Sequence, residues 1–188
     1  MREGFRFIPA DLHGAYLIEN IFTEDNRGCF QKNFEKNIFL EGGIHFRLSE
    51  SFCTVSRKNV IRGLHFQLNN PQAKLITVLQ GRVWDVIVDL RMRSETYRSW
   101  TGFELSWKNH RSLYVPKGFA HGFVSLDTDS MVMYQCDGAY DRQSDTGILF
   151  NDAGLGIDWP VDETVAVHSQ RDLGLMTLKE YERNPMKI

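Results

Sequence analysis

The segment Val83-Trp84-Asp85-Val86-Ile87-Val88-Asp89-Leu90-Arg91 has the composition of a β-strand with two different faces. Its β-branched residues favour an extended backbone, in which successive side chains point to opposite sides. The wholly apolar side consists of Trp84, Val86, Val88 and Leu90, and the other side of Asp85, Ile87, Asp89 and Arg91. The apolar side belongs to a core. The second side fits either an ion-pair network on an open sheet face or the polar interior of a barrel that holds a small ligand.

Other segments have the same strand character. In residues 101–107 apolar and polar side chains alternate, and residues 75–79, 113–115 and 131–134 are rich in apolar and β-branched residues. Turn-forming residues separate these segments about every ten positions, which is typical of sandwiches and barrels. The pattern therefore predicts a mostly β, jelly-roll-like barrel.

Helical signals are weak and confined to two short stretches. Residues 34–40 precede Gly42 and Gly43, which are suited to the end of a helix, and residues 178–183 precede Pro185. We expect a short helix at each place. No repeat or linker divides the chain, so residues 1–188 are expected to form a single domain.

The composition is that of an ordinary globular protein, with 42% hydrophobic residues and a formal charge of −2. This charge balance and the shortness of the apolar runs predict neither a nucleic-acid nor a membrane partner. The first residues contain no apolar signal core, so a cytoplasmic location is expected. Cys29, Cys53 and Cys136 are odd in number and scattered, and we expect them to be reduced and half-buried.

Three basic residues, His65, His121 and Lys74, are candidates for chemistry, although each also has an ordinary structural interpretation. Strand alternation in residues 60–67 puts Arg62 with Leu64 on one face and His65 on the other. A single histidine such as His65 or His121 is more often a hydrogen-bonded structural residue than a catalyst. Lys74 fits a solvated position at a strand start, or an inward cation for an anionic intermediate or a phosphate.

The remaining candidates are equally weak when taken one at a time. Tyr134 and Tyr140 fit core tyrosines with a wetted hydroxyl, and Asp172 fits a helix cap or a loop acid. No HxH or HExxH pattern is present, which disfavours a metal site. The glycine-rich nucleotide motifs and the GxSxG motif are also missing, so nucleotide-cofactor and serine-hydrolase functions have no support.

A series of motifs between Asp25 and Asp172 occurs in the order of one known family. The motifs are Asp25-x-Arg27-Gly28-x-Phe30, Arg62-Gly63-Leu64-His65-Phe66-Gln67, Lys74-Leu75, Pro116-x-Gly118-Phe119-Ala120-His121-Gly122-Phe123, Tyr134-x-Cys136, Gly156-Ile157-x-Trp159-Pro160 and Ser169-x-x-Asp172. Together they resemble the dTDP-4-dehydrorhamnose 3,5-epimerase family. The resemblance implies a cupin-like jelly-roll homodimer that needs no cofactor or metal and acts on a nucleoside-diphosphate 4-keto-6-deoxy sugar.

The resemblance also implies roles for nine residues. His65 would be the general base, oriented by Asp172, and Tyr134 the acid on the opposite face of the sugar ring. Lys74 would stabilise the enolate oxygen. The substrate-binding positions would be Arg27, which would meet the diphosphate of its own or of the other subunit, together with Arg62, His121, Tyr140 and Arg171.

Three positions depart from the family pattern. Lys32, Glu50 and Phe52 stand where the family usually has glutamate, glutamine and asparagine. We interpret these positions as part of the nucleotide-contacting surface and not of the chemical centre, so a dTDP-, CDP- or GDP-linked substrate and reaction at C3, C5 or both stay open. A shifted alignment near residue 50 would give the same departure. The competing functions are a non-catalytic nucleotide-sugar-binding barrel and a metal-dependent cupin enzyme.

Overall fold

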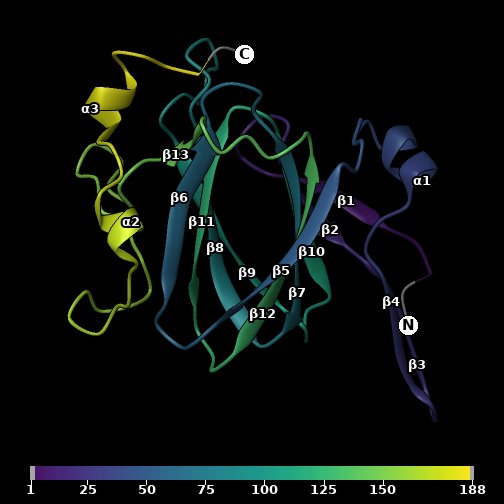
Figure 1. Ribbon diagram of the computed structural model, residues 1–188. Coiled ribbons are helices and arrows are strands. Elements are labelled where there is room, and N and C mark those ends of the chain that lie inside the picture. Colours follow the sequence, from purple (N-terminus) through teal and green to yellow (C-terminus); the bar gives the residue numbers. More distant parts are fainter. Residues whose placement is uncertain (1–2, 187–188) are drawn as a thin grey trace.

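The computed structural model describes residues 3–186 and consists mainly of two sheets that face each other (Figure 1). The larger sheet contains, in spatial order, β1 (Arg6–Pro9), β2 (Tyr16–Glu19), β10 (Arg111–Val115), β7 (Ala73–Gln80), β12 (Ser130–Asp137) and β5 (Glu50–Ser56). The smaller contains β13 (Asp145–Gly147), β6 (Ile61–Gln67), β11 (Phe119–Ser125), β8 (Arg82–Asp89) and β9 (Trp100–Ser106). All pairings within both sheets are antiparallel. The predicted cupin-like jelly roll is confirmed.

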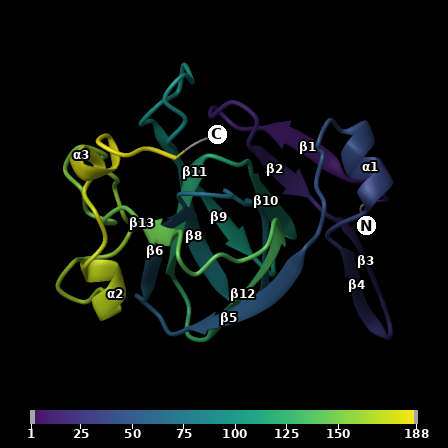
Figure 2. The ribbon, with the colours of Figure 1, turned by 45° about the horizontal axis from the view of Figure 1, so that its top comes forward.

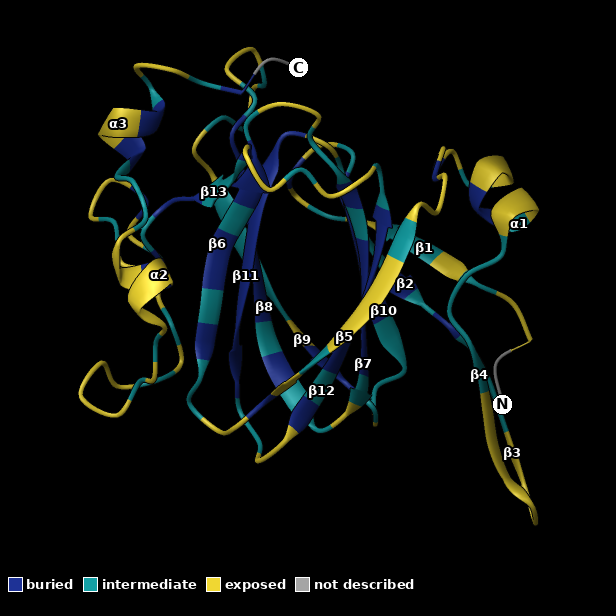
Figure 3. Cartoon of the chain, in the orientation of Figure 1, coloured by how far each residue is buried: buried dark blue, intermediate teal, exposed yellow. Residues whose placement is uncertain are grey.

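The alternation predicted for residues 83–91 is present in β8, but both of its faces are buried (Figure 3). Val83 and Ile87 belong to the core between the sheets. Val86 and Val88 belong to a second core, on the outside of the smaller sheet under the C-terminal segment. The polar residues of the inner face are therefore enclosed, and Asp85 has no exposed surface.

The short elements lie outside the barrel (Figures 1 and 2). On one side α2 (Gln170–Leu173) and α3 (Leu178–Tyr181) lie near β6 and β13. On the other side are α1 (Lys36–Glu41) and a hairpin formed by β3 (Ile21–Asp25) and β4 (Gly28–Lys32). The two predicted helices correspond to α1 and α3, whereas α2 was not expected. In the described part of the chain no helix has the length and apolarity required to cross a membrane.

A bulge in β6 changes which residues share a face. His121 of β11 is paired with His65, whereas Phe123, two residues later, is paired with Arg62, three residues earlier. The extra residue on β6 reverses the alternation, because opposite faces recur with a period of two. Arg62 and His65 therefore both face the space between the sheets, and Leu64 packs in the outer core. The prediction that Arg62 shares a face with Leu64 was wrong.

Glycines allow this bulge to pass close to β11. Gly63 has a φ of +130°, and a Cβ atom built there would lie 2.5 Å from the Gly122 Cα. Only glycine tolerates both the backbone conformation and this approach. The Gly63–Gly122 contact thus sets the positions of the two neighbouring candidate residues on β6.

Candidate active site

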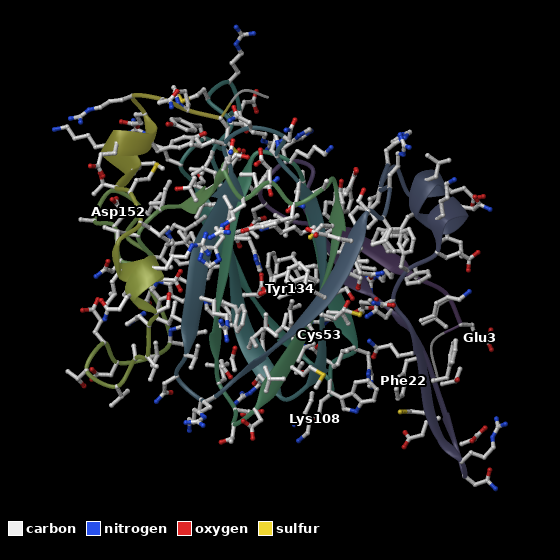
Figure 4. All side chains as sticks on the ribbon, viewed as in Figure 1. Glu3, Phe22, Cys53, Lys108, Tyr134 and Asp152 are labelled. Atoms are coloured by element: carbon white, nitrogen blue, oxygen red, sulfur yellow. The ribbon has the colours of Figure 1, made fainter. Side chains whose placement is uncertain are left out.

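A cavity of about 220 Å³ lies between the two sheets. Both sheets contribute side chains, and Figure 4 shows Tyr134 directed into the space between them. The lining residues are Glu50, Phe52, Thr54, Arg62, His65, Phe66, Gln67, Gln72, Lys74, His121, Tyr134, Cys136, Tyr140, Asp145 and Arg171. The cavity brings together seven of the nine predicted site residues. Asp172 lies behind this lining, in contact with His65.

His65 and Asp172 form a hydrogen-bonded pair. His65 Nε2 lies 2.7 Å from Asp172 Oδ1, and the two side chains are 26% and 6% exposed. Ser169 caps α2 by accepting the backbone N–H of Asp172, which holds the carboxylate against β6. Burial lowers the pKa of His65, an effect that Asp172 opposes. Because Nε2–H donates to Asp172, Nδ1 is left with the lone pair that can accept a proton.

Tyr134 lies on β12, in the sheet opposite His65. Burial raises the pKa of its phenol, so Tyr134 carries its proton across the physiological pH range. Its ring stacks on Phe52 of the neighbouring strand, with centroids 4.9 Å apart and planes inclined by 10°. A neutral imidazole and a protonated phenol thus face one cavity from opposite sheets.

Lys74 lies beside Cys136 in the ladder between β7 and β12, and both line the cavity. Burial lowers the pKa of Lys74, and the acids Asp145, Asp85 and Glu50 oppose this effect. Burial also raises the pKa of the Cys136 thiol to about 11. The nearby acids thus favour the charged form of Lys74, and its low hydration lets this cation interact strongly with an oxyanion.

His121 and Asp85 form a second histidine–aspartate pair, of which His121 lines the cavity. Its Nε2 lies 2.9 Å from both carboxylate oxygens of Asp85, and the His121 and Asp85 side chains are 3% and 0% exposed. Burial raises the pKa of Asp85, and His121 opposes this shift. The sequence left open whether Asp85 lies on an open sheet face or in a polar interior, and it did not predict the pairing of Asp85 with His121.

Three segments meet through Asp145 at the edge of the cavity. Arg171 Nη2 of α2 lies 2.8 Å from Asp145 Oδ2, and the Tyr140 hydroxyl donates to the same oxygen at 3.0 Å. Sequence reasoning identified Arg171 and Tyr140 but missed Asp145. Only the antiparallel pairing of β13 with β6 brings Asp145 beside Gln67 and hence to the cavity, and no local pattern records that pairing.

Arg62 is held at the wall by the end of β5. Its Nε donates to Ser56 Oγ at 2.9 Å, and Ser56 itself is buried. The guanidinium is thus oriented before any ligand binds. A planar guanidinium fixed in this way is suited to bind phosphate or sugar oxygens.

Arg27 does not line the cavity. It lies at the turn of the β3–β4 hairpin, which projects from the barrel (Figure 1), with its side chain 85% exposed and 2.6 Å from Asp25 Oδ2. Lys32, on the same hairpin, pairs with Glu35. A role for Arg27 at the diphosphate would need the hairpin to reach another copy, and that stays a prediction.

Glu50 and Phe52 both line the cavity, and Phe52 directly contacts Tyr134. Phe52 therefore lies beside Tyr134 of the predicted chemical centre, whereas the sequence interpretation had placed it apart from that centre. The prediction of half-buried cysteines was also wrong, because Cys29 and Cys53 are exposed and Cys136 is fully buried. All three are free thiols.

Comparison with known proteins identifies the family. The sequence model of the dTDP-4-dehydrorhamnose 3,5-epimerase family matches residues 9–180. This chain is 42% identical over 187 residues to the dTDP-4-dehydrorhamnose 3,5-epimerase of Methanothermobacter thermautotrophicus, and the match covers 98% of each chain. The chain belongs to the dTDP-4-dehydrorhamnose 3,5-epimerase family. It is accordingly an isomerase of the epimerase class.

Solved structures of the epimerase family are similar over nearly the whole chain. The dTDP-4-dehydrorhamnose 3,5-epimerase of Bacillus anthracis with TDP and PPi bound is 41% identical, with a TM-score of 0.89, covering 93% of this chain and 100% of that one. The dTDP-6-deoxy-D-glucose-3,5-epimerase of Legionella pneumophila in complex with dTDP-4-keto-L-rhamnose is 35% identical, with a TM-score of 0.92, covering 98% and 100%. A 3′-monoepimerase of Streptomyces bikiniensis in complex with dTDP-quinovose is 29% identical, with a TM-score of 0.86, covering 93% and 89%.

Residues 3–186 contain no group of three or more histidine, cysteine, aspartate or glutamate side chains arranged to hold a metal ion. The two histidines at the cavity instead direct one nitrogen each to a buried carboxylate. Each pair is thus built to hold and orient an imidazole.

Proposed function

We propose that the protein epimerises a nucleoside-diphosphate 4-keto-6-deoxy sugar at C3, C5 or both, without a cofactor. The single observation that carries this proposal is that His65 and Tyr134 line one cavity from opposite sheets. Inversion at carbon requires removal of a proton on one face and return of a proton on the other. The 4-keto group acidifies the neighbouring C–H bonds, so each transfer needs only an acid or a base.

His65 is the proposed base. Its lowered pKa keeps it neutral near pH 7, and the Nε2 contact with Asp172 directs the basic Nδ1 away from the carboxylate. When His65 accepts the proton, Asp172 stabilises the resulting imidazolium. The pair therefore makes proton removal easier without itself being consumed.

Tyr134 is the proposed acid, and Lys74 the cation at the ketone oxygen. The enolate formed by proton removal carries its negative charge on that oxygen, where a poorly hydrated ammonium is effective. Tyr134 then delivers its proton to carbon from the opposite face. Before the next turnover His65 gives its proton to solvent and Tyr134 takes one up, so both return to their starting states.

The sugar nucleotide itself is proposed to contact the remaining basic and aromatic groups. Arg62, His121, Tyr140 and Arg171 line the cavity and offer donors to the sugar and phosphate oxygens. The ligands of the Bacillus and Legionella structures support a dTDP-linked substrate as the first to test. A homodimer, in which the projecting hairpin brings Arg27 to the phosphates of the other copy, is part of this proposal.

Proton NMR in deuterated water tests the reaction. With dTDP-4-keto-6-deoxyglucose, the protein is expected to introduce deuterium at C3, C5 or both. His65→Ala should slow this exchange by about 10²-fold or more while nucleotide-sugar binding is kept. His45→Ala, at an exposed position outside the cavity lining, is the matched control and should leave exchange unchanged. Tyr134→Phe should reduce product formation more than exchange.

Other results would replace the proposal. Binding of the dTDP-, CDP- and GDP-linked 4-keto sugars without exchange would make the protein a non-catalytic sugar-nucleotide barrel. Stoichiometric iron or zinc in active protein would favour a metal-dependent cupin enzyme. A fully active His65→Ala variant would remove His65 from the role of base, and equal loss of exchange and product in Tyr134→Phe would make Tyr134 an organiser of the pocket.

A further inference from the structure

The edge strand β5 supplies part of the cavity wall. Its alternate residues Glu50, Phe52 and Thr54 line the cavity, although β5 is the outermost strand of its sheet and most of it is exposed (Figure 3). Phe52 is 46% exposed. A half-exposed phenylalanine at a cavity edge is costly to hydrate and needs an explanation beyond core packing.

Phe52 covers the ring of Tyr134. The two residues are direct partners in the β5–β12 ladder, and their rings are nearly parallel at 4.9 Å. This distance and inclination match an offset stack, which is favourable beyond the area it buries. Tyr134 is only 8% exposed, although β5 is the edge strand and lies directly beside β12.

His121 restrains the same phenol from a second direction. Its ring lies edge-on to Tyr134, with centroids 5.8 Å apart and planes inclined by 76°. Phe52 comes from the neighbouring strand of the same sheet and His121 from the opposite sheet. Two rings from different elements therefore limit both sliding and tilting of the Tyr134 side chain.

We infer that Phe52 is a positioning residue for Tyr134, which fixes the phenol for proton delivery to carbon and keeps water from its outer face. This inference rests on the proposed function. Misplacement of a reacting group by about 1 Å can cost about 10²-fold in rate. Proton removal by His65, on the opposite sheet, makes no use of this stack.

The two proton transfers should consequently respond differently to loss of the ring. His65 is 26% exposed, so its captured proton can exchange with deuterated solvent and return to the same face of the sugar. Exchange then continues without inversion. Phe52 thus controls the partition of the enolate between return to substrate and conversion to the epimer.

The test compares deuterium exchange with epimer formation in one NMR time course. Phe52→Ala is expected to lower epimer formation about tenfold or more, while exchange and KM change by less than about threefold. Phe52→Tyr retains a stacking ring and should restore the wild-type ratio. Val55→Ala is the matched control, because Val55 is 52% exposed on the same strand and does not line the cavity.

A double variant separates positioning from a general loss of packing. In a Tyr134→Phe background the acid is already missing, so Phe52→Ala should have little further effect on epimer formation. Phe52→Leu serves the same comparison if Phe52→Ala does not fold. A raised KM with an unchanged exchange-to-epimer ratio would overturn the inference, as would equal losses of exchange and product. Absence of exchange by the wild-type protein would instead overturn the proposed function itself, and this inference with it.

Discussion

Asp172 contacts His65 through a hydrogen bond of 2.7 Å, and Ser169, the N-cap of α2, accepts the backbone N–H of Asp172. Burial by itself would raise the pKa of Asp172, but the hydrogen bonds of His65 and Ser169 and the charges of His65 and Arg171 together lower it. The Asp172 carboxylate is therefore ionised at the pH values at which His65 is neutral. The same charge counteracts the burial that lowers the pKa of His65.

Asp172→Asn tests this coupling through pH dependence. If His65 is the base as proposed, its neutral form is the active one, so the rate falls at pH values below the pKa of His65, which is itself below its ordinary value. Removing the carboxylate charge removes the influence that raises this pKa, so the acidic limb of kcat/KM should move to still lower pH. The plateau should also fall, by about 10²-fold or more. A pH profile of the exchange rate measures both, and a limb that moves to higher pH would contradict the coupling.

The β6 strand places two site residues through its irregularity. Regular alternation predicts opposite faces for Arg62 and His65, whereas the extra residue near Gly63 turns both to the cavity. The alternation of residues along one strand cannot predict a bulge, because the bulge depends on how closely β11 approaches β6. The strands themselves were predictable from composition, whereas this register shift was a property of the pair.

Gly63→Ala should destabilise the protein through both φ and contact. The added Cβ would lie 2.5 Å from Gly122 Cα and 3.0 Å from His121 O, both of which are backbone atoms. We expect a loss of about 3 kcal/mol or more in the free energy of unfolding, measured as a lower urea midpoint. Gly28→Ala is the control for φ alone, since Gly28 has a φ of +123° and open space around it, and should cost about 1 kcal/mol. Equal losses in the two variants would contradict the role of the close approach.

At the scale of the whole molecule, the predicted chemistry comes from segments far apart in the sequence. Local patterns could predict the strands and the two-faced β8, and the family motifs singled out His65, Lys74 and Tyr134. They could not place Asp145 beside Arg171, since β13 joins the cavity only through its pairing with β6. They also could not reveal that Arg27 lies on a hairpin that leads away from its own barrel.

The position of Arg27 makes a prediction about assembly that mixed dimers can test. If the hairpin serves another copy, Arg27→Ala should raise KM about tenfold or more by removing a charged phosphate contact. Co-expressed Arg27→Ala and His65→Ala chains would then form mixed dimers in which one site has both residues intact. Random mixing should restore about a quarter of the wild-type activity, because half of the dimers are mixed and one of their two sites works.

The same mixture distinguishes the alternative in which Arg27 serves its own chain. The only sites with an intact His65 would then lack Arg27, so mixing should restore no activity at low substrate concentration. Separately purified and unmixed variants provide the baseline, and light scattering of the wild-type protein should report about twice the 21.8 kDa of one chain. Activity regained only on mixing requires that a complete site draws on two chains. The exposed hairpin would then supply a phosphate-binding residue to the site of the other copy.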